Sequence, residues 1–224
     1  MVTPQLSYPN KSHRKKVNIP GPSVELAEFV GIMLGDGGIN NPWQANISMN
    51  AVADAFYSKY VEGLIIRLFG VKPAIRKRKE RDTLIISLAS TTIVDYLVSI
   101  GLPRGNKLRA GLKIPNWILN NPTYSNACVR GLMDTDGCLY IHRHKVGGMK
   151  YRNLGLCFSS YSPILIEQMA KLFEESSIMP HINGTGRSIY LYRVSAVERY
   201  LSTFGTSNER LKSLYRKWKG AGAV

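Results

Sequence analysis

An internal repeat constrains the fold of this chain more than any other feature. FVGIMLGDG (29–37) is matched by VRGLMDTDG (129–137), with a glycine and an aspartate at the same positions of both copies. Two further pairs of windows match in the same order: YSKYVEGLIIRLF (57–69) with YSPILIEQMAKLF (161–173), and YLVSIG (96–101) with YLSTFG (200–205). Three matches in one order indicate a duplication, so both halves should form the same structural unit.

Each unit is predicted to contain a helix, two strands, a helix, two strands and a final helix. This order gives an α/β protein of the α+β type with two pseudo-symmetric αββαββα halves. The first helix is expected from Ser23, a favourable N-cap residue, to Gly35. Its apolar residues have the spacing of one helical face, and they are Leu26, Phe29, Val30, Met33 and Leu34.

The predicted strands alternate with period two, so each has a core face and an outward polar face. In the first half the core residues are Ala45, Ile47, Met49, Leu84, Ile86 and Leu88. The outward residues of that half are Gln44, Asn46, Ser48, Arg76 and Arg78. In the second half Leu139, Ile141, Leu154, Leu156 and Phe158 face the core. The outward residues there are Tyr140, His142, His144, Tyr151, Asn153, Tyr190 and Tyr192.

We divide the chain into a basic N-terminal arm (1–22), a first half (23–113), a linker (114–126) and a second half (127–224). The linker is assigned to IPNWILNNPTYSN because this stretch is rich in asparagine and contains two prolines. The arm contains KSHRKK, which is either a solvated tail or a segment that follows a nucleic acid backbone.

The composition fits a folded protein with a strongly basic surface. Of 224 residues 44% are hydrophobic, and 30 Lys and Arg stand against 15 Asp and Glu, so the net charge is +15. This charge predicts a nucleic acid partner, with a merely basic soluble protein or a membrane-surface protein as alternatives. Three cysteines argue against a disulfide framework, and no apolar run is long enough to span a membrane. We therefore expect an intracellular protein that is not secreted.

The repeated aspartates, Asp36 and Asp136, end the first helix of each half. Small residues four positions apart lie on one face of each helix: Gly31 and Gly35 in the first, Gly131 and Thr135 in the second. If the helices cross there, the two carboxylates come side by side and repel each other unless a cation lies between them. Hard oxygen ligands favour Mg²⁺, so the pattern predicts a magnesium site.

A simpler interpretation is that each aspartate only ends a helix beside a glycine. The helix macrodipole disfavours an acid at this end, and its occurrence at two equivalent positions favours the metal site. A zinc site at Cys138, His142, His144 and Cys157 lacks the usual ligand spacing. GDGG lacks the preceding strand of a dinucleotide fingerprint, and DTDGCLYIHRHK lacks the ligands of a calcium loop.

FVGIMLGDG and VRGLMDTDG resemble the two motif helices of the LAGLIDADG homing endonucleases in their single-chain form. The element order extends the resemblance over nearly the whole chain after Ser23. It implies that Asp36 and Asp136 bind two or more shared Mg²⁺ ions, helped by the backbone carbonyls of Gly35 and Thr135. It also implies a monomer whose two four-stranded antiparallel sheets form a saddle in the major grooves of double-stranded DNA. Such proteins cut both strands and leave 3′ overhangs.

The family also places a basic residue near each scissile phosphate. The resemblance assigns this role to Lys107 in GLPRGNKL, and the repeat places Arg210 of GTSNERL at the equivalent position. Such a cation can orient an attacking water or offset phosphoryl charge. The chain departs from the family pattern where many members have a glutamine after the second strand, and Asn50 and Ser160 occupy these places.

Outward strand residues have the side-chain types that read base edges in the major groove. The expected DNA-reading residues are Gln44, Asn46, Ser48, Arg76, Arg78, Tyr140, His142, His144, Asn153, Tyr190 and Tyr192. Lys77, Lys79 and Arg81 are expected to pair with phosphates, and the alternative is that these faces are only solvated.

The sequence therefore predicts a site-specific, metal-dependent endonuclease that cuts a long asymmetric DNA target. Two alternatives use the same saddle: a maturase that helps an intron RNA fold, and a DNA-binding regulator without cleavage. Intact Asp36 and Asp136 favour the enzyme over the regulator.

Overall fold

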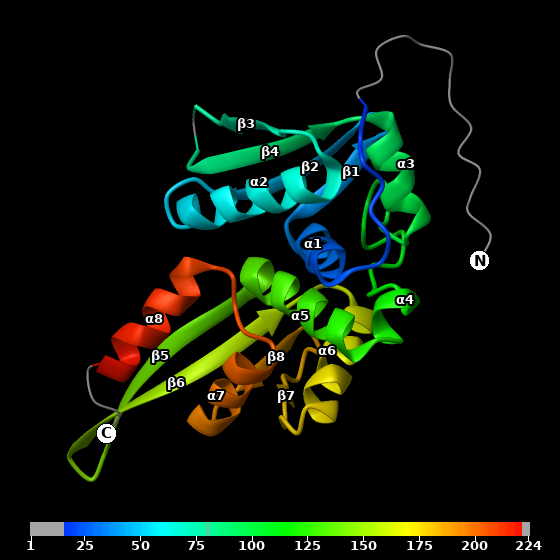
Figure 1. Cartoon of the computed structure of the whole chain (residues 1–224). Coiled ribbons are helices and arrows are strands. Elements are labelled where there is room, and N and C mark those ends of the chain that lie inside the picture. Colours follow the sequence, from blue (N-terminus) through cyan, green and yellow to red (C-terminus); the bar gives the residue numbers. More distant parts are fainter. Residues whose placement is uncertain (1–15, 80, 221–224) are drawn as a thin grey trace.

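The computed structural model describes residues 16–79 and 81–220, which form two similar halves, one above the other in Figure 1. Residues 1–15 of the predicted basic arm, and Glu80 in the turn between the third and fourth strands, lie outside the described residues. The first half contains α1 (Val24–Gly35), β1 (Gly37–Asn41), β2 (Gln44–Asn50), α2 (Ala55–Phe69), β3 (Ala74–Lys77), β4 (Thr83–Ala89) and α3 (Thr91–Ser99). The second half contains α5 (Pro122–Asp136), β5 (Gly137–Val146), β6 (Met149–Ser159), α6 (Pro163–Glu175), β7 (His181–Ile182), β8 (Ser188–Leu191) and α7 (Val194–Thr203).

This element order confirms the predicted duplication. Each half has one antiparallel four-stranded sheet, with strand orders β1-β2-β4-β3 and β5-β6-β8-β7. The register is also repeated, because Ile47 of β2 lies opposite Gly37 and Ile86, and Phe158 of β6 lies opposite Gly137 and Ile189. None of the helices in the described part of the chain combines the length and apolar character needed to cross a membrane.

Each half has a buried aromatic cluster, and the two clusters share the repeated pairs Phe69 with Phe173 and Tyr96 with Tyr200. In the first half the ring of Phe69 lies 5.4 Å from that of Phe29 and 6.4 Å from that of Tyr96, centroid to centroid. In the second half Phe173 lies 5.8 Å from Tyr200 and 5.6 Å from Phe204. Rings at these separations attract each other beyond the burial of their apolar area. Aromatic contacts therefore hold helices to one another in both halves.

The two motif helices, α1 and α5, pack against each other between the halves (Figure 1). A Cβ atom placed on Gly31 would lie 2.2 Å from the carbonyl oxygen of Cys128, and one on Gly131 would lie 2.3 Å from that of Glu28. The backbones therefore touch at these glycines, as the small residues predicted. Ser23 begins α1 as expected, because its Oγ accepts a hydrogen bond of 3.1 Å from the Leu26 amide.

Two helices lie outside the predicted order. The linker contains α4 (Asn116–Leu119), and α5 begins at Pro122, so the boundary drawn at residue 126 falls inside α5. The chain continues after α7 into α8 (Glu209–Gly220), which lies beside β5 and β6 in Figure 1. The indole of Trp218 is buried there and donates a hydrogen bond of 2.9 Å to the carbonyl of Arg152. This additional helix packs against β5, and β5 and β6 are longer than β1 and β2 of the first half.

Candidate functional site

The tips of the two motif helices bring the predicted acids together. A Cβ atom on Gly35 would lie 2.1 Å from Thr135 Oγ1 and 3.3 Å from Asp136 Oδ2, so the carboxylate of Asp136 lies against the end of α1. Asp36 is the C-cap residue of α1 itself, and its amide donates to the carbonyl of Ile32 at 3.1 Å. The crossing of α1 and α5 therefore brings Asp36 and Asp136 close together, as expected from the sequence.

The electrostatics of this tip are unfavourable without an added positive charge. Burial, followed by the charges of Asp136 and Asp54, raises the pKa of Asp36 to about 7, against the opposing charges of Lys107 and Arg210. Partial burial also raises the pKa of Asp136, which Lys107 lowers. Neither carboxylate has a hydrogen-bond donor among the described residues, so both keep oxygen atoms free to bind a cation.

Lys107 supplies one cation to this tip. Its Nζ donates to the carbonyl oxygens of Leu34 at 2.9 Å and Gly35 at 2.5 Å, at the end of α1. Burial lowers the pKa of Lys107, whereas Asp136 and Asp36 raise it. The Gly35 carbonyl, predicted to bind metal, therefore already accepts from a positive group.

The donor set fits a divalent ion that retains much of its own shell. No group of three or more His, Cys, Asp and Glu side chains converges on one point within residues 16–79 and 81–220. The protein thus offers two carboxylates and nearby carbonyls, and leaves the other coordination positions to water or phosphate. Mg²⁺ is bound in this manner more often than Zn²⁺ or Ca²⁺.

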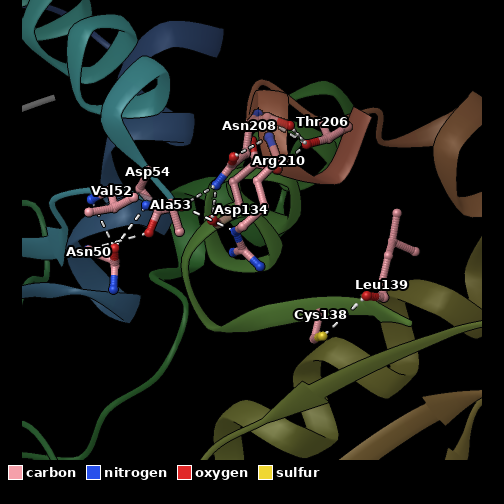
Figure 2. Close-up of polar contacts among 10 residues, drawn as sticks. All are labelled: Asn50, Val52, Ala53, Asp54, Asp134, Cys138, Leu139, Thr206, Asn208 and Arg210. Atoms are coloured by element: carbon pink, nitrogen blue, oxygen red, sulfur yellow. Dashed lines mark hydrogen bonds and ion pairs between the residues drawn. The ribbon is translucent and has the colours of Figure 1, made fainter. Parts of the chain in front are cut away.

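A hollow of ≈ 400 Å³ opens beside Asp36. Lys107, Asn46 and Ser48 line it, and the Ser48 amide donates to the carbonyl of Asp36 at 3.1 Å. Asn50 does not line this hollow: its Oδ1 accepts from the amides of Val52 and Ala53 at 2.9 and 2.8 Å in the turn before α2 (Figure 2).

Ser160 likewise uses its side chain locally, accepting a hydrogen bond of 3.1 Å from the amide of Ser162. The register instead makes Ser159 the counterpart of Ser48, because each follows the residue paired with the first glycine of its sheet. Ser48 and Ser159 therefore hold equivalent positions in the two sheets, two residues before Asn50 and one residue before Ser160.

Arg210 does not mirror Lys107. Its Nε forms an ion pair of 3.2 Å with Oδ1 of Asp54, the residue before α2 in the other half (Figure 2). Nδ2 of Asn208 donates to the same oxygen at 3.1 Å. Arg210 still belongs to the site, since its charge lowers the pKa of Asp36.

Sequence reasoning missed the segment between α7 and α8, which crosses both motif helices. Asp134 of α5 accepts hydrogen bonds from the Thr206 hydroxyl and, at 2.7 Å, from the Ser207 amide. Nδ2 of Asn208 donates to the carbonyl of Asp134 at 2.9 Å. Burial raises the pKa of Asp134 to about 7, although these bonds oppose the shift. One signal was available: Asp134 occupies the place of a core leucine, Leu34, in the first copy of the motif.

A second buried acid, Glu28 of α1, completes this connection. Its carboxylate accepts from Arg130 Nη2 at 2.6 Å, from the Tyr60 hydroxyl at 2.8 Å and from the Ser207 hydroxyl at 2.7 Å. Glu28 is 3% exposed, so its charge needs all of these partners. The bonds join α1, α2 and α5 to the segment before α8.

The predicted outward residues of the first sheet share one face. Asn46, Ser48 and Arg76 are linked by the register, because Asn46 lies opposite Ser87, and Ser48 and Arg76 both lie opposite Ile85. The Ser87 hydroxyl donates to Oδ1 of Asn46 at 2.7 Å. Gln44 and Arg78 follow the same alternation, whereas Lys77 lies on the other face.

The basic residues near the β3–β4 turn are solvent-exposed. Lys77 forms an ion pair of 3.3 Å with Asp82, and Lys79 and Arg81 are exposed without an ion pair among the described residues. Salt screens charges that are exposed in this way, and exposed Lys and Arg side chains are among the types that contact phosphates.

Aromatic and imidazole rings cover the outward face of the second sheet. The ring of His144 stacks on His142 at 5.1 Å and on Tyr151 at 5.4 Å, and Tyr190 stacks on Tyr192 at 5.4 Å. The register confirms the predicted face, with Tyr140 opposite Gly155 and His142 opposite Asn153. A Cβ atom on Gly155 would lie 2.4 Å from the ring of Tyr140, so the ring can pack over this position because Gly155 has no side chain. A small hollow of ≈ 190 Å³ between Tyr140, His142, Asn153 and Tyr192 opens on this face.

No protein-family model matches the chain. Among solved structures, it is similar to the I-LtrWI LAGLIDADG homing endonuclease bound to target DNA, with a TM-score of 0.59, 11% identity, and coverage of 89% of this chain and 90% of that one. It is similar to I-DmoI in complex with DNA and Ca, with a TM-score of 0.57, 16% identity, and coverage of 87% and 97%. It also matches full-length DUF199/WhiA from Thermatoga maritima, with a TM-score of 0.54, 14% identity, and coverage of 92% and 64%.

These likenesses establish the fold. The chain has the two-layer α+β fold of the LAGLIDADG homing endonucleases, in the single-chain form with two pseudo-symmetric halves and two motif helices at their interface. The resemblance drawn from FVGIMLGDG and VRGLMDTDG is confirmed at this level.

Proposed function

We propose that this protein is a monomeric, site-specific DNA endonuclease that hydrolyses one phosphodiester bond in each strand of a long asymmetric target. The observation that carries the proposal is the convergence of Asp36 and Asp136 at the tips of α1 and α5, beside the ammonium group of Lys107. Structural acids at helix ends have no reason to be brought together across an interface, because their charges repel.

Double-stranded DNA is the proposed partner. The I-LtrWI and I-DmoI structures with the same fold contain DNA. The net charge of +15 favours a polyanion. The outward faces of both sheets carry hydrogen-bonding and aromatic side chains of the kinds that recognise bases. We assign Gln44, Asn46, Ser48, Arg76 and Arg78 to one half-site, and Tyr140, His142, His144, Asn153, Tyr190 and Tyr192 to the other. Lys77 and Lys79 are assigned to phosphates.

Asp36 and Asp136, with the carbonyls of Gly35 and Thr135, would hold Mg²⁺, which supplies charge stabilisation and a more acidic water when bound. In the reaction, a water oxygen attacks phosphorus and the bond from phosphorus to the 3′ oxygen breaks, leaving a 5′ phosphate and a 3′ hydroxyl. Lys107 and Arg210 are placed near the acids, where their charges offset the negative charge that develops on the phosphoryl oxygens. Cuts in the two strands are proposed to leave 3′ overhangs.

The test selects cleaved sites from a randomised duplex library with Mg²⁺, and then compares variants on the selected duplex. Asp36→Asn and Asp136→Asn keep the shape of the carboxylates but remove the charge that binds the metal. We expect each to slow cleavage about a hundredfold or more, with DNA affinity kept or increased. Asp95→Asn on α3 is the matched control and should cut normally. Near-normal cleavage by either motif variant would show that these aspartates only end their helices.

A DNA-binding regulator without cleavage is the second candidate, and one contact favours it. The carbonyl of Gly35, a proposed metal ligand, already accepts a hydrogen bond from Lys107. A regulator would yield no cleaved sites, and it would bind a duplex selected by affinity equally well in Mg²⁺, Ca²⁺ and chelator. Preferential binding of a structured intron RNA over any duplex would instead support the maturase.

A further inference from the structure

The two basic residues of the candidate site are held in different ways. Within residues 16–79 and 81–220, the Lys107 ammonium group donates its hydrogen bonds to the carbonyls of Leu34 and Gly35, which belong to its own half, and the charge of Asp136 in the other half acts on it without an ion pair. Arg210 forms its ion pair with Asp54, which belongs to the other half (Figure 2). The repeat makes Lys107 and Arg210 equivalent, so this difference is a property of the folded chain and not of the motif.

Asp54 occupies the N-cap position of α2, where an aspartate normally bonds to the first amides of its helix. Its side chain makes no such capping bond. Oδ1 instead faces Asn208 Nδ2 at 3.1 Å and Arg210 Nε at 3.2 Å, and Oδ2 accepts a longer bond of 3.4 Å from the Asn50 amide. Oδ1 of Asp54 therefore bonds to residues of the second half and not to the first amides of α2.

No acid among residues 122–220 of the second half forms an ion pair with Lys107. Ser162 holds the N-cap position of α6, and its Oγ accepts from the Leu165 amide at 3.3 Å. The same hydroxyl donates to the carbonyl of Leu112 at 2.6 Å. The helix that corresponds to α2 therefore begins with a neutral residue that caps it, and Lys107 forms no ion pair among the described residues.

Two features make the Asp54 contact a restraint and not a passing surface pair. The Asp54 side chain is 15% exposed and that of Arg210 34% exposed, so the pair is partly shielded from solvent, Asp54 more than Arg210. The backbone amide of Arg210 also donates to Oδ1 of Asn208 at 2.9 Å, and Asn208 is fully buried. Asn208 therefore fixes the backbone of Arg210 while Asp54 fixes its guanidinium.

We infer that Asp54 is a positioning residue that holds Arg210 at the site, and that the two DNA strands are cut by unequal centres, one depending on Lys107 and the other on Arg210 with Asp54. The inference rests on the proposed nuclease function. It adds that an acid of the first half, Asp54, positions a basic residue of the second half, Arg210. Lys107 of the first half has no equivalent ion pair with the described residues of the second half.

The experiment measures each strand separately, with differently labelled ends on the selected duplex, at saturating protein and Mg²⁺. In Asp54→Asn we expect the rate of one strand to fall about tenfold and the other to stay within about twofold, so that nicked duplex accumulates. The dissociation constant for DNA should stay within about twofold, because a positioning residue affects the reaction step. Glu25→Gln breaks the exposed Glu25–Arg67 ion pair of 2.7 Å on the same half and should change neither strand.

A combined variant gives the decisive comparison. Asp54→Asn with Arg210→Gln should cut the sensitive strand no more slowly than Arg210→Gln alone, because both changes disable one unit. Equal slowing of both strands by Asp54→Asn, or effects of the two changes that multiply, would overturn the inference.

Unfolding in denaturant provides a readout that does not need cleavage. The two single changes should lower the unfolding midpoint by amounts that are not additive in the combined variant. Additive shifts would show that Asp54 does not hold Arg210, even if the protein cut no duplex at all. Failure of the wild-type protein to cut, together with non-additive shifts, would overturn the proposed function and the strand asymmetry but keep the contact.

Discussion

At the scale of single residues, Gly31 sets how closely the motif helices approach. A Cβ atom there would lie 2.2 Å from the carbonyl oxygen of Cys128, which belongs to the backbone of α5 and cannot rotate away. We therefore expect Gly31→Ala to push the helices apart and lower the free energy of unfolding by about 1 to 3 kcal/mol. Denaturant unfolding measures this loss, and a DNA cleavage assay should show it accompanied by slower cutting.

Gly63 provides the matched control at the same scale. It lies within α2, and a Cβ atom there would meet only the end of the Arg67 side chain, at 3.4 Å. Alanine is favoured over glycine inside a helix, so Gly63→Ala should raise the free energy of unfolding by up to about 1 kcal/mol. If both variants changed stability alike, the loss in Gly31→Ala would not come from helix contact.

At the scale of elements, β3 and the residue that follows it present Arg76 and Arg78 to one proposed half-site. Arg76 is opposite Ile85, on the face that also carries Asn46 and Ser48. Removing a bidentate contact with a base costs about 1 to 3 kcal/mol of discrimination. Arg76→Ala and Arg78→Ala should thus relax base choice in one half-site only, as measured by competition between duplexes with single base changes in each half.

Lys77 of the same strand is the control for this prediction. It lies on the opposite face and pairs with Asp82 at 3.3 Å. Lys77→Ala should weaken binding of all sequences to a similar degree and lower the salt dependence of affinity slightly. Equal relaxation of both half-sites by the arginine variants would contradict the assignment of this sheet to one half-site.

At the scale of the whole molecule, two halves of one backbone plan carry different surfaces. The first sheet offers amides, hydroxyls and arginines, and the second offers stacked imidazole and phenol rings. The preferred target should therefore be asymmetric. Palindromic duplexes built from either half-site should bind at least about tenfold more weakly than the selected target, since one half of each then meets the wrong face. Selection of palindromes from a random library would count against this asymmetry.

The sequence by itself determined the duplication, the strand faces and the place of the acids. These features depend on neighbours a few residues apart: period two places His142 and Asn153 on the outward face, and small residues four apart place Gly31 and Gly35 on one side of α1. Because the two motif helices are repeats, Asp36 and Asp136 were expected at equivalent positions at the C-terminal ends of these helices. Local periodicity is encoded in the chain, so it can be read without the fold.

Only the tertiary structure decided how the two halves complete each other. Asp54 and Arg210 are 156 residues apart in the chain, and no periodicity relates them. Asp54 was indistinguishable from an ordinary N-cap residue until the start of α2 and the start of α8 were placed side by side. The same holds for Asp134, whose burial is tolerable because Thr206 and Ser207 arrive from the far end of the chain. A buried charge needs partners that only the packed molecule supplies, and for that reason the sequence could place the acids of this site but not the contacts that distinguish its two halves.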